Sequence, residues 1–240
     1  IEQYQLDTRI LSVDAIVPTT ILSLRAMYFT DRKEAAIQLA KLVSAHKGPQ
    51  TLVLAIPRGG VPIGYVLANL LEAPIDLLMA KKIGFPGDPE YAIGAVCENE
   101  TIIDENSGVS PEYIIQQRDK IKKELKYRYT ILTGRQRALS VQRKKVILVD
   151  DGIATGRTML AAVRAIRKQR PASLIIAVPV CSFEASTRLK PEVDELVSCY
   201  YPDPFVGVGR FYREFTQVTD QEVIGMLRST SPSSPSPVIE

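Results

Sequence analysis

Residues 146–158 read VILVDDGIATGRT, a stretch that combines an apolar strand, an acidic pair and a small-residue turn. Four apolar residues in a row are typical of a strand covered on both faces, as in a parallel sheet. Asp150 and Asp151 follow at its carboxyl end, and the turn around Gly156 opens the next helix. Ligands of open α/β sheets bind beyond the carboxyl ends of the strands. We therefore expect a ligand site at residues 150–158.

Outward from this stretch, strand-like and helix-like patterns alternate along the chain. Apolar runs predict strands at residues 51–56, 74–80, 146–149, 173–178 and 193–199, with a hairpin formed by residues 91–96 and 101–103. Caps and periodicity predict one helix that begins at Asp31. They predict further helices at residues 60–71, 111–132, 156–169, 182–189 and 219–227. This alternation indicates an open, mostly parallel α/β sheet flanked by helices.

The composition is that of a globular chain that folds without disulfides. It has 240 residues, 45% of them hydrophobic and 24% charged, with a net charge of +3. Its three cysteines form no CxxC pair, which favours a reducing compartment. The single histidine, His46, excludes zinc sites built from several imidazoles, and we expect it to cap a helix end. Without an apolar run of about 18 residues, we predict no membrane span and a cytoplasmic location.

We divide the chain into three parts. Residues 1–26 show no clean periodicity, and we expect an N-terminal extension, either translated from an early start codon or forming a structural arm. Residues 27–228 hold the predicted α/β domain. Residues 229–240 are rich in serine and proline, so we expect a disordered tail.

The turn after the acidic pair has the features of a phosphate site. Backbone N–H groups at the start of a helix converge where the helix dipole favours an anion. Thr155 and Thr158 add hydroxyl donors, and Gly156 allows close backbone approach. Asp150 and Asp151 offer oxygens to vicinal hydroxyls or to Mg²⁺. These features together describe a ribose 5-phosphate site, and the alternative is a generic turn with two surface aspartates.

A second glycine-bearing corner lies at residues 55–64, AIPRGGVPIG. Gly59 and Gly60 let backbone amides wrap around an anion, and the Arg58 guanidinium can hold two oxygens at once. Taken alone, this motif fits a plain turn with a solvated arginine better. Together with residues 146–158, it indicates one ligand held from both ends.

Residues 146–158 resemble the 5-phosphoribosyl 1-diphosphate (PRPP) signature of type I phosphoribosyltransferases, and residues 55–64 are similar to that family's pyrophosphate loop. The resemblance covers residues 27–227 and is strongest to a bacterial group whose acceptor base is unassigned. It implies that Asp150 and Asp151 bind the ribose hydroxyls and Mg²⁺. It implies that the 5-phosphate is held by Ala154, Thr155, Gly156, Arg157 and Thr158. It implies that the pyrophosphate is held by Arg58, Gly59 and Gly60.

Residues 79–90, MAKKIGFPGDPE, correspond to a basic pair and a mobile flap in that family. The resemblance implies that Lys81 or Lys82 neutralises the departing diphosphate, and that Glu90 or Asp88 accepts a proton from the incoming base. Lys82 and Glu90 thus join Asp150 and Asp151 as predicted catalytic residues. The alternative is a pair of solvated lysines beside exposed loop acids.

The aromatic loop at residues 200–212 corresponds to the variable hood that grips the base in this family, with Phe205 as our candidate wall residue. A loop that packs on the core explains these aromatics equally well. Ala154 stands where the 6-oxopurine enzymes carry an aspartate, which disfavours hypoxanthine and guanine. Arg157 instead makes the turn similar to that of pyrimidine-operon regulators, which use this fold to bind RNA.

Residues 118–145 carry eleven Lys or Arg and only two acidic residues. A solvated helix explains this charge, and so does attraction for PRPP or nucleic acid. Tyr127 and Tyr129 lie within the segment without forming an obvious stacking set.

Two functions follow from these patterns. The first is a Mg²⁺-dependent phosphoribosyltransferase that moves ribose 5-phosphate from PRPP to a nucleobase-like acceptor and releases pyrophosphate. The alternative is a non-catalytic regulator that senses PRPP or nucleotides and binds RNA through residues 118–145. We expect PRPP and a small nucleobase-like molecule as partners, a homo-oligomer, and no membrane; nucleic acid is the less favoured partner.

Overall fold

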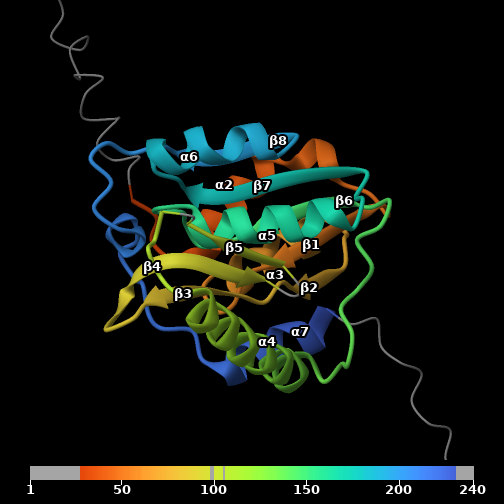
Figure 1. The fold of residues 1–240 in the computed structure, drawn as a ribbon. Coiled ribbons are helices and arrows are strands. Elements are labelled where there is room, and N and C mark those ends of the chain that lie inside the picture. The colour runs from red at the N-terminus through yellow and green to blue at the C-terminus, as the bar shows by residue number, and fades with distance from the viewer. Residues whose placement is uncertain (1–27, 98–99, 105, 231–240) are drawn as a thin grey trace, which may run out of the picture.

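A five-stranded parallel sheet forms the centre of the fold in the computed structural model, which describes residues 28–97, 100–104 and 106–230 (Figure 1). The strand order is β2-β1-β6-β7-β8. The strands are β1 (Thr51–Ala55), β2 (Ile75–Leu77), β6 (Lys145–Val149), β7 (Ser173–Val180) and β8 (Glu195–Tyr200). The predicted fold class, an open parallel α/β sheet flanked by helices, is confirmed.

The register of β1 and β6 decides where their loops emerge. These two strands are neighbours, and Ala55 lies opposite Val149. Because parallel neighbours that end in register deliver the chain to the same edge, residues 56–60 and residues 150–158 leave the sheet side by side.

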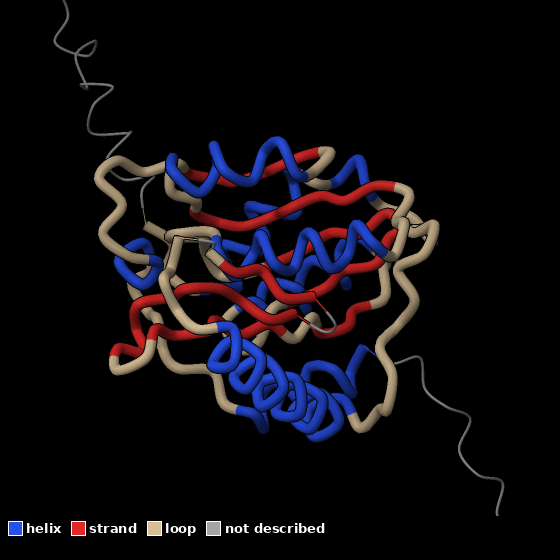
Figure 2. Tube along the Cα trace, viewed as in Figure 1, coloured by secondary structure: helices blue, strands red, loops and turns tan. Residues whose placement is uncertain are grey.

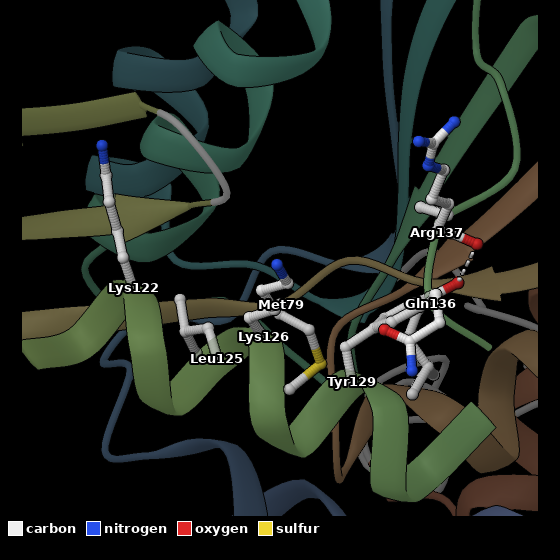
Figure 3. A pocket seen from close by; sticks show the side chains of 9 residues that line it. Met79, Lys122, Leu125, Lys126, Tyr129, Gln136 and Arg137 are labelled. Atoms are coloured by element: carbon white, nitrogen blue, oxygen red, sulfur yellow. Dashed lines mark hydrogen bonds between the residues drawn. The ribbon is translucent and has the colours of Figure 1, made fainter. Parts of the chain in front are cut away.

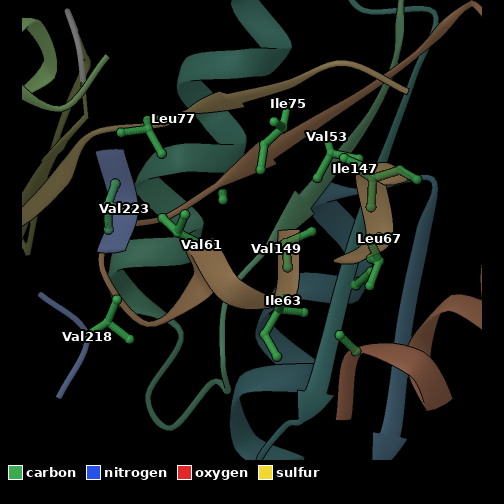
Figure 4. Packing of buried hydrophobic residues seen from close by; sticks show 14 of the residues in the cluster. Val53, Val61, Ile63, Leu67, Ile75, Leu77, Ile147, Val149, Val218 and Val223 are labelled. Carbon is green, nitrogen blue, oxygen red and sulfur yellow. The ribbon is translucent and has the colours of Figure 1, made fainter. Parts of the chain in front are cut away.

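Helices cover both faces of the sheet because alternate strand residues point to opposite sides (Figure 2). Val53 and Ile147 pack with α2 (Arg32–Leu42), α3 (Gly60–Leu71) and α7 (Asp220–Thr230), in the cluster that Figure 4 shows. Leu54 and Leu148 pack with α5 (Arg157–Lys168) and α6 (Phe183–Leu189) on the other side. The three middle strands β1, β6 and β7 are therefore mostly apolar on both faces rather than alternating.

Side-chain caps begin several helices where the sequence predicts them. The Asp31 carboxylate accepts a hydrogen bond from Glu34 N at 2.8 Å, although Glu34 returns its bond to Thr30 N instead of Asp31 N. Thr219 and Glu222 form a reciprocal capping box, with bonds of 3.2 and 2.7 Å. Such caps satisfy N–H groups that have no partner inside the helix.

The segment that resembles a basic pair and a flap contributes to a second, antiparallel sheet of three strands. This sheet consists of β3 (Ala80–Phe85), β4 (Asp88–Cys97) and β5 (Glu100–Ile103), and the β4–β5 pair confirms the predicted hairpin. The strand expected at residues 74–80 is divided: β2 ends at Leu77 and β3 begins at Ala80. Pairing with β4 satisfies the backbone of residues 80–85, which is why the glycine- and proline-rich segment forms strands joined by a short turn.

The long helix α4 (Pro111–Thr133) is attached to the edge strand β2 through the buried carboxylate of Asp76. Tyr129 Oη lies 3.0 Å from both Asp76 oxygens, and Arg135 Nη2 donates at 2.8 Å. Leu139 N, in the connector between α4 and β6, donates at 2.7 Å. Burial raises the pKa of Tyr129, so the phenol keeps the proton that it donates. One buried acid thus fixes α4 and the connector against β2.

Three further expectations concern the termini and His46. The extension at residues 1–26 lies outside the described residues, as do residues 231–240, and α7 continues through Thr230, beyond the boundary predicted at residue 228. The prediction that His46 caps a helix end is wrong, because its Nε2 lies 2.8 Å from Glu195 Oε2 on β8. Within the described part of the chain, no helix combines the length and apolarity that crossing a membrane requires.

Replacing Tyr129 with phenylalanine removes the hydroxyl that donates to Asp76 and leaves the ring in place. We expect Tyr129→Phe to lower the free energy of unfolding by about 1–3 kcal/mol, since a buried acceptor loses a donor. Tyr127→Phe, at a side chain that is 68% exposed, is the matched control and should change it by less than about 0.5 kcal/mol. Urea unfolding measures both, and equal effects would refute the anchoring role of Asp76.

Candidate functional site

The two glycine-bearing corners are in direct contact beyond the carboxyl ends of β1 and β6. A methyl group added at Gly59 would lie 2.0 Å from Asp151 Oδ2, and one at Gly60 would lie 2.7 Å from Val149 O. Arg58, Gly59 and Asp151 line one cavity of about 320 Å³ together with Arg32 and residues 215–218. The corners that the sequence analysis combined therefore share a cleft, and only residues without a Cβ allow them to approach this closely.

The acidic pair is partly buried, which raises the pKa of both carboxyl groups. Burial is the main cause at Asp150, and the neighbouring charge of Asp151 raises the pKa of Asp150 further, well above its usual range. Burial also raises the pKa of Asp151, while the Arg32 guanidinium opposes that increase. Asp151 N donates to Asp150 Oδ1 at 2.8 Å. The pair therefore favours additional positive charge or hydrogen-bond donors from a ligand.

Arg32 is a site residue that the sequence analysis missed. Its Nε and Nη2 donate to Asp151 Oδ2 at 3.0 and 2.8 Å, and its Nη1 donates to Thr216 O at 2.8 Å. The guanidinium carbon lies 3.9 Å from the centre of the Phe215 ring. Arg32 is the first residue of α2, and 119 positions separate it from Asp151. No local pattern signals such a contact.

The turn at residues 154–158 presents its N–H groups while its carbonyls are bound from behind. Gly156 has φ +72°, a conformation that favours glycine, and it immediately precedes α5. Ser182 Oγ donates to Ala154 O at 2.5 Å, and Arg188 donates to Thr155 O. Within the described chain, the N–H groups of residues 154–158 make no hydrogen bond to other backbone groups. This arrangement has the donors that a phosphate requires.

The Arg157 side chain is directed to the flap instead of the turn. Its Nη1 donates to Ala92 O on β4 at 2.6 Å and lies 3.8 Å from Asp104 Oδ2. An anion at the turn therefore meets the backbone of Arg157, while the guanidinium connects α5 to the antiparallel sheet.

The structure does not bring Lys81 to the cleft. Its Nζ lies 2.8 Å from both carboxylate oxygens of Glu124 on α4, and Lys81 is not among the residues that line the cavity with Arg58. Lys82 follows it on β3, and successive strand residues point to opposite faces, so Lys82 faces away from that side. Glu90 belongs to β4, and its side chain lies outside what the structure describes.

Phe205 packs on the core, which favours the second explanation of the hood loop. Its ring centre lies 5.3 Å from that of Phe211, and it contacts the main apolar cluster. The aromatic residues at the cleft are instead Phe215, which lines it, and Tyr212, whose Oη donates to Asp151 O at 2.6 Å. Phe215 lies three positions beyond the loop that the sequence singled out.

The donor set fits a magnesium ion that a ligand helps to hold. Among the described residues, no group of three His, Cys, Asp or Glu side chains is placed to bind a metal by itself. Mg²⁺ commonly binds one or two carboxylates and takes its other ligands from phosphates and water. Asp150 and Asp151 supply such carboxylates, and the pKa of Asp150 is raised by burial and by the charge of Asp151, both of which a bound cation would oppose.

Comparison with known proteins agrees with this fold. The family described as phosphoribosyl transferase domain matches residues 29–209, and the chain belongs to that family. Two Mycobacterium tuberculosis proteins, from strains H37Rv and CDC 1551, are provisionally named phosphoribosyl transferases and are each 33% identical over 208 residues. The match covers 83% of this chain and 46% of each relative, so the chain spans about half their length.

A solved structure is also similar over most of the chain. The crystal structure of TT1426 from Thermus thermophilus superposes with a TM-score of 0.75 at 33% identity. The match covers 86% of this chain and all of TT1426. The family's α/β architecture is therefore shared by a relative of substantial sequence identity.

Neutralising Asp150 should stabilise the protein, because burial and Asp151 oppose its charge. We expect Asp150→Asn to raise the free energy of unfolding at pH 7 by roughly 1–2 kcal/mol. A carboxyl with a raised pKa loses its unfavourable charge as pH falls through that pKa, so the advantage of the variant should disappear toward acid pH. Thermal unfolding against pH measures this, with Asp119→Asn on the exposed face of α4 as the charge-matched control. A destabilised Asp150→Asn protein would contradict the electrostatic account.

Gly59→Ala tests the contact between the corners. The added methyl group would overlap the Asp151 carboxylate, so we expect the free energy of unfolding to fall by about 1–3 kcal/mol. Gly225→Ala adds the same methyl group on α7, with no atom within 4 Å, and should be neutral or stabilising. Calorimetric melting temperatures compare the two, and an unaffected Gly59→Ala protein would show that the corners are further apart.

Proposed function

We propose that this protein transfers ribose 5-phosphate from PRPP to a nucleobase-like acceptor and releases pyrophosphate. The observation that carries the proposal is the contact between the Arg58–Gly60 corner and the Asp150–Asp151 pair. Arg58, Gly59 and Asp151 line one cavity. PRPP carries anionic groups at both ends of a sugar with vicinal hydroxyls. A cleft lined by Arg58 and Asp151, with Asp150 and the turn at residues 154–158 next to Asp151 in the chain, matches those groups in kind.

Each part of the site has a proposed binding role. Arg58 and the backbone N–H of Gly59 bind the diphosphate, since a guanidinium and an amide donor suit phosphate oxygens. The N–H of Gly60 donates to Ile56 O at 3.1 Å, so the proposed role of Gly60 is to allow close approach of the ligand. Asp150 and Asp151 accept hydrogen bonds from the ribose hydroxyls. The 5-phosphate binds at the turn, to the backbone of residues 154–158 and to the hydroxyls of Thr155 and Thr158.

In the proposed reaction, an acceptor nitrogen forms a bond to the anomeric carbon of the ribose. The bond from that carbon to the diphosphate oxygen breaks, and pyrophosphate leaves with the electron pair. Arg58 stabilises the charge that grows on pyrophosphate, and the carboxylates stabilise the positive charge that develops on the ribose ring. Lys82 and Glu90 keep their proposed roles toward the leaving group and the acceptor proton. Mg²⁺, held by Asp150 and Asp151 with the substrate, would supply further electrostatic stabilisation.

Arg32 is proposed as a positioning residue for Asp151. Its guanidinium opposes the rise in the pKa of Asp151 that burial causes, so it favours the ionised form that accepts hydrogen bonds. The same guanidinium holds Thr216 O and stacks on Phe215. Arg32 therefore also fixes the segment that closes the cleft above the proposed ribose site.

The RNA-binding alternative receives less support from the basic segment at residues 118–145. Three of its arginines are paired with acids: Arg118 with Asp119, Arg128 with Asp220 and Arg135 with Asp76. Lys81 in turn pairs with Glu124, one of the two acids in the segment. Part of the charge is thus used to hold α4 to its neighbours, and we favour the transferase.

Pyrophosphate release from PRPP and Mg²⁺ tests the function across purines, pyrimidines and pyridine carboxylates. We expect release that depends on one acceptor class, stops when Mg²⁺ is chelated, and falls by about 100-fold or more in Arg58→Ala. Arg164→Ala, on α5 and paired with Glu192, is the control and should retain activity. The proposal would be overturned if no acceptor in the panel supported pyrophosphate release, or if the two variants were equally active.

A further inference from the structure

A cavity of about 370 Å³ lies beside the outer edge of β2, between α4 and residues 136–138 (Figure 3). Leu77 and Met79 provide its apolar floor, and Leu125 contributes from α4. β2 is the last strand of the parallel sheet on this side. None of the residues that line this cavity also lines the cleft between Arg58 and Asp151. The cavity is therefore separate from the proposed PRPP site.

The walls of the cavity are held apart by the bonds to Asp76. Tyr129 fixes α4, Leu139 N and Arg135 fix the connector, and Asp76 itself belongs to β2. Tyr129 Oη also lies 3.2 Å from Arg137 O, along the dashed line in Figure 3. Because three walls meet at one buried acid, the space between them is preformed, as small-molecule sites commonly are.

Among the described residues, the charged side chains that line the cavity are all cationic: Lys122, Lys126 and Arg137. Within the described chain, no ion pair is formed by the side chains of Lys126 or Arg137. Figure 3 shows the Lys126 side chain extending beside that of Met79. Two cations without an acidic partner therefore border an apolar floor.

This combination selects one kind of ligand. An inorganic anion would leave Leu77, Met79 and Leu125 uncovered, and a neutral apolar molecule would leave the cations without a partner. An organic cation would be repelled. We propose that the cavity binds a small amphipathic organic anion, with a compact apolar body on Met79 and an acidic group beside Lys126 and Arg137. This site goes beyond PRPP transfer and does not depend on it.

Methionine methyl groups report on binding directly. Met79 lines the cavity, whereas Met159 is buried in α5 on the other side of the sheet, so ¹³C-methyl methionine spectra contain a probe and an internal control. The Met79→Leu variant assigns the signal. We expect 2-naphthoate to shift the Met79 resonance and leave Met159 unchanged. It should bind at least about fivefold tighter than 2-naphthylmethanol, which has the same apolar body, and 2-naphthylmethylammonium should be weakest.

Charge-removing variants separate the cavity from the general charge of α4. The double variant Lys126→Ala, Arg137→Ala should weaken 2-naphthoate binding about tenfold, because the loss of each cation should weaken it by about two- to fivefold. The matched double variant Lys120→Ala, Lys123→Ala removes two cations of the same helix that do not line the cavity, and should leave binding within about twofold. An unchanged Met159 signal verifies the fold of each variant.

Three results would overturn the proposal. The first is a Met79 resonance that does not move with 2-naphthoate up to about 10 mM, a concentration that reveals even weak affinity. The second is equal affinity for the acid and the alcohol. The third is an equal loss of binding in the two double variants, which would mean that general charge and not the cavity attracts the probe.

Discussion

The close approach of Gly59 and Gly60 to Asp150 and Asp151 is the constraint on which the site depends. β1 and β6 are parallel neighbours that end in register, so their loops emerge together and compete for the same space. A side chain at either glycine would overlap Asp151 or the backbone of Val149 and Asp150. Because Gly59 and Gly60 have no Cβ atom, the corner that carries Arg58 packs against the two aspartates. That proximity allows one ligand to contact both.

The same proximity gives the site its electrostatic character. Packing the corner over the aspartates partly buries two like charges, and burial raises the pKa of each. Arg32 provides the opposing charge, and its contacts with Phe215 and Thr216 attach a segment near the end of the chain to the cleft. The charge of the pair is thus unfavourable, and under the proposed function the hydroxyl donors of the substrate and Mg²⁺ would relieve it.

Asp76 plays the corresponding role at the far edge of the sheet. It gathers Tyr129, Arg135 and Leu139 at one buried carboxylate, so that a polar and strongly basic helix packs on an edge strand. Some of the basic residues in the segment 118–145 have a structural role, because Arg135 forms an ion pair with Asp76 and Arg128 forms one with Asp220. The cavity-lining pair Lys126 and Arg137 takes no part in these ion pairs.

The sequence by itself determined the elements whose signals are local. α3 begins and ends at Gly60 and Leu71 as predicted, the apolar run at residues 146–149 is a buried strand, and both glycine-bearing corners follow from strand, turn and helix patterns. Only the tertiary structure decided the contacts between distant residues: Arg32 with Asp151, Lys81 with Glu124, Arg157 with Ala92, and His46 with Glu195. Periodicity and caps report on neighbours within a few positions, whereas long charged side chains take whichever partner the packing of the sheets brings within reach.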